Sequence, residues 1–198
     1  MSRFIETIRI FNGRRYNLSR HSARMNRTRL AIFGCRDVLN LHHVLIVPEN
    51  ARQGLVKCRI IYGKEILRIE FDPYIVRPVN SLKVMDAGDL DYPYKSTDRH
   101  AIDALYAQRE MCDDILMTRD GFVTDTSYAN IALRRGNRWY TPATPLLAGT
   151  MRAQLIDQGR LLPAVIRTED LPAYSECLLI NAMLGFDPRR AFSMDAIR

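Results

Sequence analysis

Three short segments of the chain contain groups that can bind an anion or act as a nucleophile. Lys95 lies in Tyr-Lys-Ser-Thr-Asp-Arg, and the pKa of a lysine amine falls readily in a desolvated or cationic setting. Arg24 ends a His-x-x-Arg segment, and its guanidinium group fits a phosphate well. Gly149 begins Gly-Thr-Met-Arg at an expected helix start, where backbone N–H groups favour a dianion. A lysine in a loop is ordinarily exposed to solvent, and any helix start offers free N–H groups, so each of these segments alone is a weak signal for such a site.

The composition is that of an ordinary globular protein. The 198 residues suit one compact unit or two small subdomains, with 47% hydrophobic and 26% charged residues. No apolar run approaches the roughly 20 residues that span a bilayer, and the N-terminus lacks the apolar core of a secretory signal. We therefore expect a cytoplasmic protein with no membrane partner. The four cysteines form no CxxC pair and the four histidines complete no zinc spacing, so no metal site is predicted.

The formal net charge of +7 raises the question of nucleic-acid binding. Basic residues cluster between positions 14 and 36, but acidic residues dominate positions 86–98 and 113–125. No nucleic-acid-binding signature is present, so no nucleic-acid partner is predicted. A positive field that attracts an anionic cofactor and an anionic substrate explains the charge better.

The first 78 residues predict a sheet with helices. The expected strands are Phe4 to Phe11, Arg15 to Leu18, Leu55 to Tyr62 and Glu65 to Phe71, joined by turns at Asn12-Gly13 and Gly63-Lys64. Ser19 is the expected N-cap of a helix that runs to about Phe33, where Gly34 ends it. A second helical stretch is expected from Arg36 to His43.

The remaining residues, 79–198, predict a second subdomain of short strands and two helices. The expected strands are Leu82 to Met85, Ile115 to Thr118, Phe122 to Thr124, Ala129 to Leu133, Arg138 to Thr141 and Cys177 to Asn181. The expected helices are Thr97 to Glu110 and Gly149 to Gln158. Together the two parts predict an α+β fold with a mostly antiparallel sheet, divided into subdomains 1–78 and 79–198.

In their order and spacing, four groups of residues resemble the class IV aminotransferases, which are fold type IV enzymes that use pyridoxal phosphate. They are Phe4 to Arg9 with Leu18 to Met25, Tyr94 to Arg99, Asp120 to Ile131, and Tyr140 to Pro142 with Leu147 to Arg152. The family groups branched-chain and D-amino-acid aminotransferases with aminodeoxychorismate lyase. The resemblance extends from Phe4 to about Gly185. It implies two subdomains with pyridoxal phosphate at their junction, a small-molecule amino substrate and a homodimer.

The resemblance also implies the main cofactor contacts. Lys95 matches the lysine that binds the cofactor covalently. Asp125 falls where the family usually has a glutamate facing the pyridine nitrogen, and a carboxylate there keeps that nitrogen protonated, so the ring accepts electrons. From the residues alone, Asp125 could instead cap the turn before Ala129. The residues that match the family's phosphate-binding groups are Arg24, Thr150 and Met151.

The resemblance implies a second set of contacts with the phosphate or the substrate. Asn181, in Asn-Ala-Met-Leu-Gly, resembles a segment of the lyase, although an asparagine at a strand end needs no ligand. His100 stands where the branched-chain enzymes carry a tyrosine, and it could contact the cofactor ring or face the helix surface. The candidate partners for substrate carboxylates are Arg9, Arg77, Arg99 and Arg152.

The Lys-x-x-x-Arg spacing of Lys95 and Arg99, with the Asn181 segment, is closer to the lyase than to the branched-chain aminotransferases. The leading hypothesis is therefore a pyridoxal-phosphate lyase that eliminates pyruvate from an amino-substituted chorismate and gives p-aminobenzoate. A transaminase of small or branched-chain amino acids is the first alternative. The others are a non-catalytic pyridoxal-phosphate-binding protein and a basic nucleic-acid-binding module.

Overall fold

The computed structural model describes residues 2–198, which form two compact units. The first unit contains the residues up to Val76 together with Tyr94–Asp98, and the second contains Arg77–Pro93 and Arg99–Arg198. The sequence predicts a division after residue 78, two residues from the observed one. It assigns residues 94–98 to the second subdomain, whereas the structure groups them with the first unit.

Backbone hydrogen bonds to the N-terminal strand explain why residues 94–98 belong to the first unit. The N–H of Ile5 donates to the carbonyl of Lys95 (2.9 Å), and the N–H of Thr97 donates to the carbonyl of Arg3 (2.9 Å). Bonds between residues some ninety positions apart leave no local sequence pattern, so the segment could not be assigned from its own composition.

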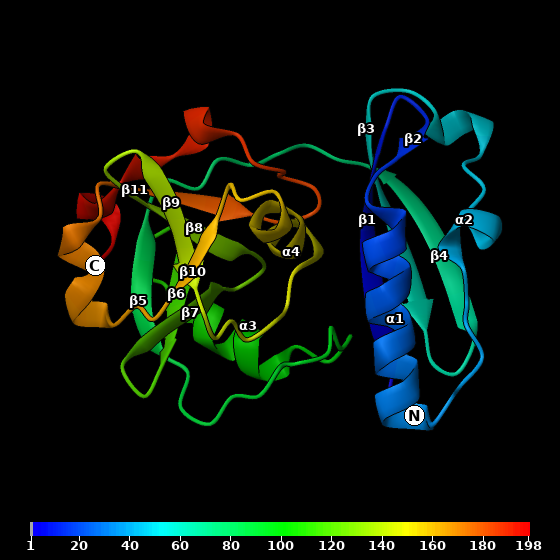
Figure 1. Ribbon diagram of the computed structural model, residues 1–198, viewed down its shortest axis with the longest axis horizontal. Coiled ribbons are helices and arrows are strands. Elements are labelled where there is room, and N and C mark those ends of the chain that lie inside the picture. The colour runs from blue at the N-terminus through cyan, green and yellow to red at the C-terminus, as the bar shows by residue number, and fades with distance from the viewer. Residues whose placement is uncertain (1) are drawn as a thin grey trace. The chain divides into compact units, whose positions relative to one another are not determined.

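The first unit is an antiparallel sheet with one long helix along a face (Figure 1). The strands, in spatial order, are β2 (Arg14–Arg15), β1 (Phe4–Phe11), β3 (Leu55–Tyr62) and β4 (Ile66–Pro73). The helices are α1 (Leu18–Phe33), α2 (Leu41–Val44) and the 3-10 turn η1 (Glu49–Ala51). Alternate side chains of β1, among them Ile8 and Ile10, pack with Met25 of α1 in the core of this unit. This packing fixes α1 against β1.

The start of α1 corrects one prediction. The helix begins at Leu18, and the residue before it is Asn17, with φ of 60° in the left-handed region that asparagine tolerates better than most residues. The carbonyl of Asn17 accepts the first two hydrogen bonds of the helix, at 3.1 and 3.2 Å. Ser19 is therefore inside the helix and is not its N-cap. The strand predicted from Arg15 to Leu18 ends at Arg15, because the left-handed backbone of Asn17 is not extended.

The predicted helix between Arg36 and His43 is also wrong, because only α2 is helical there. Side chains of α1 bind the backbone of residues 37 and 39, which precede α2. The fully buried Arg29 donates to the carbonyl of Asp37 (2.9 Å), and Asn26 binds both the N–H and the carbonyl of Leu39 (3.0 and 2.9 Å). The N–H of Leu39, which donates to Asn26, is therefore not available for a helical hydrogen bond.

The second unit contains a five-stranded sheet of order β10-β9-β8-β11-β12 and a three-stranded sheet of order β5-β6-β7. The strands are β5 (Leu82–Asp86), β6 (Asp114–Arg119), β7 (Phe122–Thr126), β8 (Asn130–Arg135), β9 (Arg138–Pro142), β10 (Leu162–Ala164), β11 (Glu176–Ile180) and β12 (Phe192–Ser193). β5 pairs with β6 and β9 with β10 in parallel, and the other pairs are antiparallel. The predicted α+β fold with mostly antiparallel pairing is confirmed.

The helices of the second unit are short. They are α3 (His100–Ala107), α4 (Thr150–Asp157) and the 3-10 segments η2 (Thr168–Ala173), η3 (Pro188–Arg190) and η4 (Met194–Ala196). The predicted helix over 97–110 is shortened at both ends. Its start is displaced because the N–H and hydroxyl groups of Thr97 both bind the carbonyl of Arg3. The Asp120-Gly121 turn between β6 and β7 was expected, and both residues have positive φ there.

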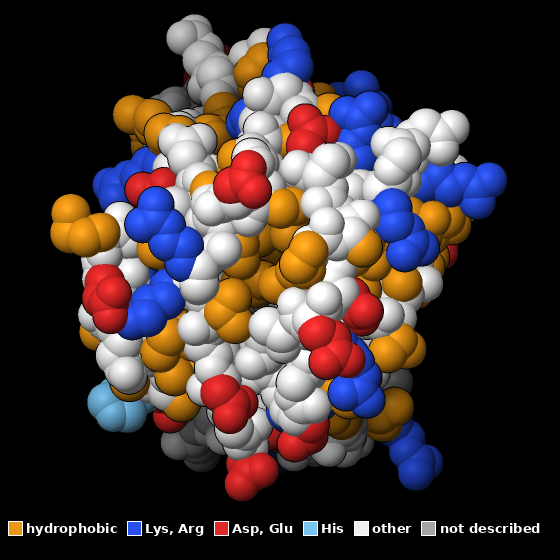
Figure 2. All heavy atoms as spheres, turned by 90° about the vertical axis from the view of Figure 1, so that its left-hand side faces the viewer, with side chains coloured by type: hydrophobic (Ala, Val, Ile, Leu, Met, Phe, Trp, Pro, Cys, Tyr) orange, Lys and Arg blue, Asp and Glu red, His pale blue; other side chains and the backbone are white. Residues whose placement is uncertain are grey.

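Charged side chains of both signs are interspersed on the face of the molecule shown in Figure 2. Among the described residues of that face, no continuous basic area is visible of the kind that nucleic acids bind. Within residues 2–198, no helix combines the length and the apolar character needed to cross a membrane. No group of three or more histidine, cysteine or acidic side chains among these residues could hold a metal ion.

Candidate active site

A buried ionic cluster joins β1 to α1 in the first unit. Glu6, which is fully buried, accepts hydrogen bonds from Nε (2.9 Å) and Nη2 (2.6 Å) of Arg24. Nδ1 of His21 lies 2.6 Å from the same carboxylate. His21 and Arg24 are three residues apart on a helix and so share the face that meets the strand. We call Glu6, His21 and Arg24 the ionic cluster.

The electrostatics of the ionic cluster set its protonation. Burial alone would raise the pKa of Glu6, but the Arg24 charge and the hydrogen bonds from His21 and Arg24 hold it at about 2. Burial lowers the pKa of His21, and the charges of Arg24 and Lys95 lower it further, against the opposite effect of Glu6. At neutral pH the cluster therefore contains an ionised Glu6 and a neutral His21 that donates its Nδ1–H to Glu6.

Lys95 lies near this cluster in the first unit. Its carbonyl binds the N–H of Ile5, next to Glu6 on β1, and its charge acts on His21. Its side chain is half-buried. The structure thus brings together two of the predicted cofactor-binding residues, Lys95 and Arg24, although they are 71 positions apart in the sequence (95 − 24).

Glu6 was not identified as a site residue from the sequence. A signal was nevertheless present, because Glu6 occupies the same alternate positions of β1 as Phe4, Ile8 and Ile10, which are all buried. A glutamate on the core-facing side of a strand needs a buried partner, since an unpaired buried charge is very costly. That requirement points to a cation on a facing helix.

In the second unit the central polar residue is Asp125 on β7, which is 5% exposed. One carboxylate oxygen accepts from Nδ2 of Asn130 (2.7 Å), and the other accepts from the N–H of Leu147 (2.8 Å). Burial raises the pKa of Asp125 to about 6, although Leu147, Asn130 and the charge of Arg152 act to lower it. The alternative role of Asp125, a cap of the turn before Ala129, belongs to Thr126, whose hydroxyl accepts from the N–H of Ala129 (3.2 Å).

Asn130 holds the loop between β9 and α4 against β7. Its Nδ2 group donates to Asp125 and to the carbonyl of Leu147 (2.9 Å), and its Oδ1 lies against Gly149. Asn130 lies in the predicted segment of residues 120–131, but no separate role was predicted for it. Its position shows that it keeps Asp125 and the start of α4 together.

Gly149→Ala is expected to destabilise the second unit. A Cβ at residue 149 would lie 2.0 Å from Oδ1 of Asn130, whose amide is already held by Asp125 and Leu147. Overpacking of this kind costs about 1–3 kcal/mol of unfolding free energy, measured by urea denaturation. Gly63→Ala is the control, because its nearest neighbour is 3.9 Å away. An unchanged unfolding free energy in Gly149→Ala would mean that Asn130 can move aside.

The predicted phosphate-binding residues Thr150 and Met151 form the first turn of α4, which has no side-chain cap at Gly149. Thr150 is buried and Met151 half-buried. Arg152, a predicted substrate contact, binds the end of β9. Its Nε donates to the hydroxyl of Thr141 (3.3 Å) and its Nη2 to the carbonyl of Pro142 (2.8 Å). The helix start fits an anion, and the contact of Arg152 with a substrate stays a prediction.

The remaining predicted contacts lie in loops and helix starts of the second unit. Nη2 of Arg99 donates to the carbonyl of Ser127 (2.7 Å), and His100 is the exposed first residue of α3. Oδ1 of Asn181 accepts the N–H groups of Met183 and Leu184, both at 2.9 Å. These bonds close the turn after β11 and account for Asn181 without a ligand. Its contact with a phosphate or substrate stays a prediction.

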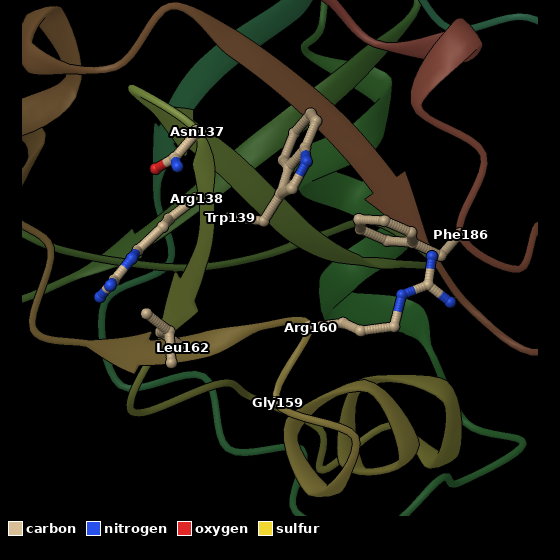
Figure 3. Close-up of a pocket in the computed structure, with 7 residues that line it drawn as sticks. All are labelled: Asn137, Arg138, Trp139, Gly159, Arg160, Leu162 and Phe186. Carbon is tan, nitrogen blue, oxygen red and sulfur yellow. The ribbon is translucent and has the colours of Figure 1, made fainter.

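A half-open pocket of about 480 Å³ lies in the second unit beside β9 (Figure 3). The rings of Trp139 and Phe186 meet edge-on with centroids 5.7 Å apart, and the Arg160 guanidinium lies 4.7 Å from the centre of the Phe186 ring. Arg138 extends away from these rings (Figure 3). None of the predicted site residues lines the pocket, so the predicted chemistry is not located there.

Comparison with known proteins identifies the family. Residues 3–191 match the model of the class IV aminotransferases, so the chain belongs to that family of enzymes. The resemblance inferred from the four groups of residues is thereby confirmed.

Three proteins of similar sequence or structure illustrate the relationship. A crystal structure from Haemophilus somnus of a protein provisionally named 4-amino-4-deoxychorismate lyase is 35% identical, with a TM-score of 0.88, over 94% of this chain and 98% of that one. An uncharacterized protein of Haemophilus influenzae is 35% identical over 182 residues, which cover 91% of this chain and 97% of the relative. A hypothetical aminotransferase from Mycobacterium tuberculosis, solved in a PLP-bound form, shares the fold at 18% identity, with a TM-score of 0.77 over 98% of this chain and 81% of that one.

Proposed function

We propose that this enzyme uses pyridoxal phosphate to eliminate pyruvate from 4-amino-4-deoxychorismate, which yields p-aminobenzoate. The observation that carries the proposal is the 35% identity, over nearly the full length of both chains, to the Haemophilus somnus protein provisionally named as this lyase. The Lys-x-x-x-Arg spacing of Lys95 and Arg99, which resembles the lyase, supports the same assignment.

The donor groups in the two units fit pyridoxal phosphate. Arg24 and the uncapped start of α4 suit a phosphate dianion. Asp125 is a buried carboxylate whose pKa is raised to about 6, so a cationic partner such as a protonated pyridine nitrogen would stabilise its charged form. Lys95 supplies the amine that a carbonyl cofactor requires.

Bound pyridoxal phosphate would supply a conjugated ring that accepts the electron pair of a breaking substrate bond. In this proposal the chain itself performs three tasks. Nζ of Lys95 takes a proton from the substrate and returns one as pyruvate leaves. Asp125 keeps a proton on the ring nitrogen, and Arg24 anchors the phosphate.

The test is a single-turnover reaction of the cofactor-loaded enzyme with 4-amino-4-deoxychorismate. We expect pyruvate and p-aminobenzoate to appear in equal amounts while the absorption spectrum of the cofactor returns to its starting form. Absence of both products would contradict the assignment of this substrate. A parallel reaction with amino-acid donors alone separates the transaminase alternative, because a transaminase would convert the cofactor to pyridoxamine phosphate. A chain that binds the cofactor and acts on neither class of substrate would be a non-catalytic binder.

A further inference from the structure

We propose that Glu6 is a positioning residue, which orients the Arg24 guanidinium for a phosphate group and fixes the proton of His21. The inference rests on the proposed use of pyridoxal phosphate, because Arg24 is the residue expected to bind its phosphate. It extends that function to a residue which would not touch the cofactor itself but would act through Arg24.

The geometry of the ionic cluster shows that Glu6 holds the Arg24 guanidinium through two hydrogen bonds; we call this pair of bonds the clamp. Nε and Nη2 form one edge of the guanidinium group, and they donate to two different oxygens of Glu6 at 2.9 and 2.6 Å. Two parallel bonds of this kind fix the plane and the direction of an arginine more tightly than one bond can. Because this edge faces Glu6, the opposite end of the group, Nη1, is directed away from the β1 carboxylate. That end is the part of Arg24 suited to a phosphate oxygen.

Burial makes the clamp rigid. Glu6 is fully buried and Arg24 is 8% exposed, so water cannot readily replace either partner. An arginine on a helix surface would otherwise sample many rotamers and lose that freedom on binding a ligand. The Glu6 contact restricts these rotamers in advance, which lowers the entropic cost of binding the phosphate.

Glu6 also sets the tautomer of His21. The Glu6 carboxylate can only accept hydrogen bonds when ionised, and Nδ1 of His21 lies 2.6 Å from it, so Nδ1 carries the hydrogen. Nε2 of the neutral ring is then an acceptor. The charge of Lys95 acts on this same ring, so the His21 ring whose tautomer Glu6 sets lies near the amine of Lys95.

A purely structural role is the competing explanation, because the same contacts would tie β1 to α1 in any protein. The two roles differ in ligand selectivity. If Glu6 acts through Arg24 on a phosphate, its removal should weaken binding of pyridoxal phosphate and leave binding of pyridoxal nearly unchanged. A structural link would affect both ligands alike, since both carry the same aldehyde and ring.

The experiment compares equilibrium binding of pyridoxal phosphate and of pyridoxal to the cofactor-free full chain, measured by equilibrium dialysis. In Glu6→Gln we expect affinity for pyridoxal phosphate to fall about 10- to 100-fold, the range seen when residues that orient metal ligands are removed. Affinity for pyridoxal should change by no more than about threefold. Arg24→Gln should show the same selective loss, and the double variant Glu6→Gln/Arg24→Gln should lose little more than Arg24→Gln alone.

The matched control is Glu176→Gln, because Glu176 also pairs with an arginine (Arg134, 2.8 Å), but does so in the partly exposed β8–β11 pair. It should change neither affinity. Glu6→Asp, which keeps the charge but shortens the reach, is the second variant if Glu6→Gln does not fold, and the same selective loss is expected.

An equal loss of affinity for both ligands, or additive losses of affinity in the double variant, would overturn the positioning role. The outcome is separable from that of the proposed reaction. A selective loss in Glu6→Gln without any pyruvate release by the native enzyme would retain the inference and reject the substrate. A native chain with no preference for pyridoxal phosphate over pyridoxal would reject the inference itself.

Discussion

Lys95→Ala is expected to abolish turnover, with a fall in kcat/KM on the order of 10⁴-fold or more, because one amine both holds the cofactor and moves the substrate proton. The chain contains four lysines in all, which makes the assignment directly testable. Lys57 pairs with Asp72, and Lys83 pairs with Glu110. Lys95 is the lysine that the structure places beside the ionic cluster of Glu6, His21 and Arg24.

Chemical labelling gives a readout that does not depend on activity. Reduction of the cofactor-loaded protein with borohydride should fix pyridoxal phosphate on the peptide that contains Lys95, as detected by mass spectrometry. The Lys95→Ala variant should carry no label. Lys64→Ala, in the exposed turn between β3 and β4, is the control and should keep both the label and the activity. A label on Lys57, Lys64 or Lys83 in the native chain would show that the assignment of Lys95 is wrong.

Asp125→Asn is expected to lower kcat by about 10²- to 10³-fold, because a neutral amide cannot hold a proton on the ring nitrogen as a carboxylate does. The amide would also place a donor where the present carboxylate accepts from Asn130 or from the N–H of Leu147. Asp114→Asn is the control: Asp114, on β6, is also buried, and burial raises its pKa as well. We expect this control to retain most of its activity. Equal loss in both variants would indicate a general effect of buried aspartates.

The pH dependence of stability tests the same residue in the cofactor-free protein. Asp125 has a folded-state pKa of about 6 against an ordinary value of 3.8, so the folded chain binds this proton more tightly than the unfolded chain does. Ionisation of Asp125 therefore costs stability as the pH rises from about 4 through 6.

Asp125→Asn removes this cost. The unfolding free energy of the variant relative to the native chain should therefore rise by about 2 kcal/mol between pH 4.5 and pH 7. Urea denaturation at the two pH values measures the difference. Because Glu6 keeps its low pKa in both proteins, its contribution to the difference in unfolding free energy cancels. A difference that is constant with pH would show that Asp125 does not titrate in this range.

The sequence predicted those elements whose pattern is local. The alternation in β1, the end of α1 at Gly34 and the Asp120-Gly121 turn all depend on neighbouring residues, and the structure contains each of them. The family could also be inferred, since four groups of residues in a fixed order carry its chemistry. Lys95, Arg24 and Asp125 as candidate site residues follow from the same groups.

The sequence prediction failed where a local helix propensity competed with hydrogen bonds from residues far away in the chain. Residues 36–40 resemble a helix start, but the buried Arg29 and the half-buried Asn26 of α1 bind their backbone. Residues 97–99 resemble the first turn of a helix, but Thr97 is held by the carbonyl of Arg3. In both places, hydrogen bonds made in the folded chain outweigh a helical preference worth only tenths of a kcal/mol per residue.

The sequence by itself therefore determined which family this chain belongs to and which residue types could hold an anionic cofactor. The tertiary structure decided how those residues are held. Only the folded chain shows that Glu6 clamps Arg24 and that Asn130 ties Asp125 to the start of α4. The physical reason is that a buried charge or amide must find its partners wherever packing places them, and packing brings together residues that the chain keeps far apart.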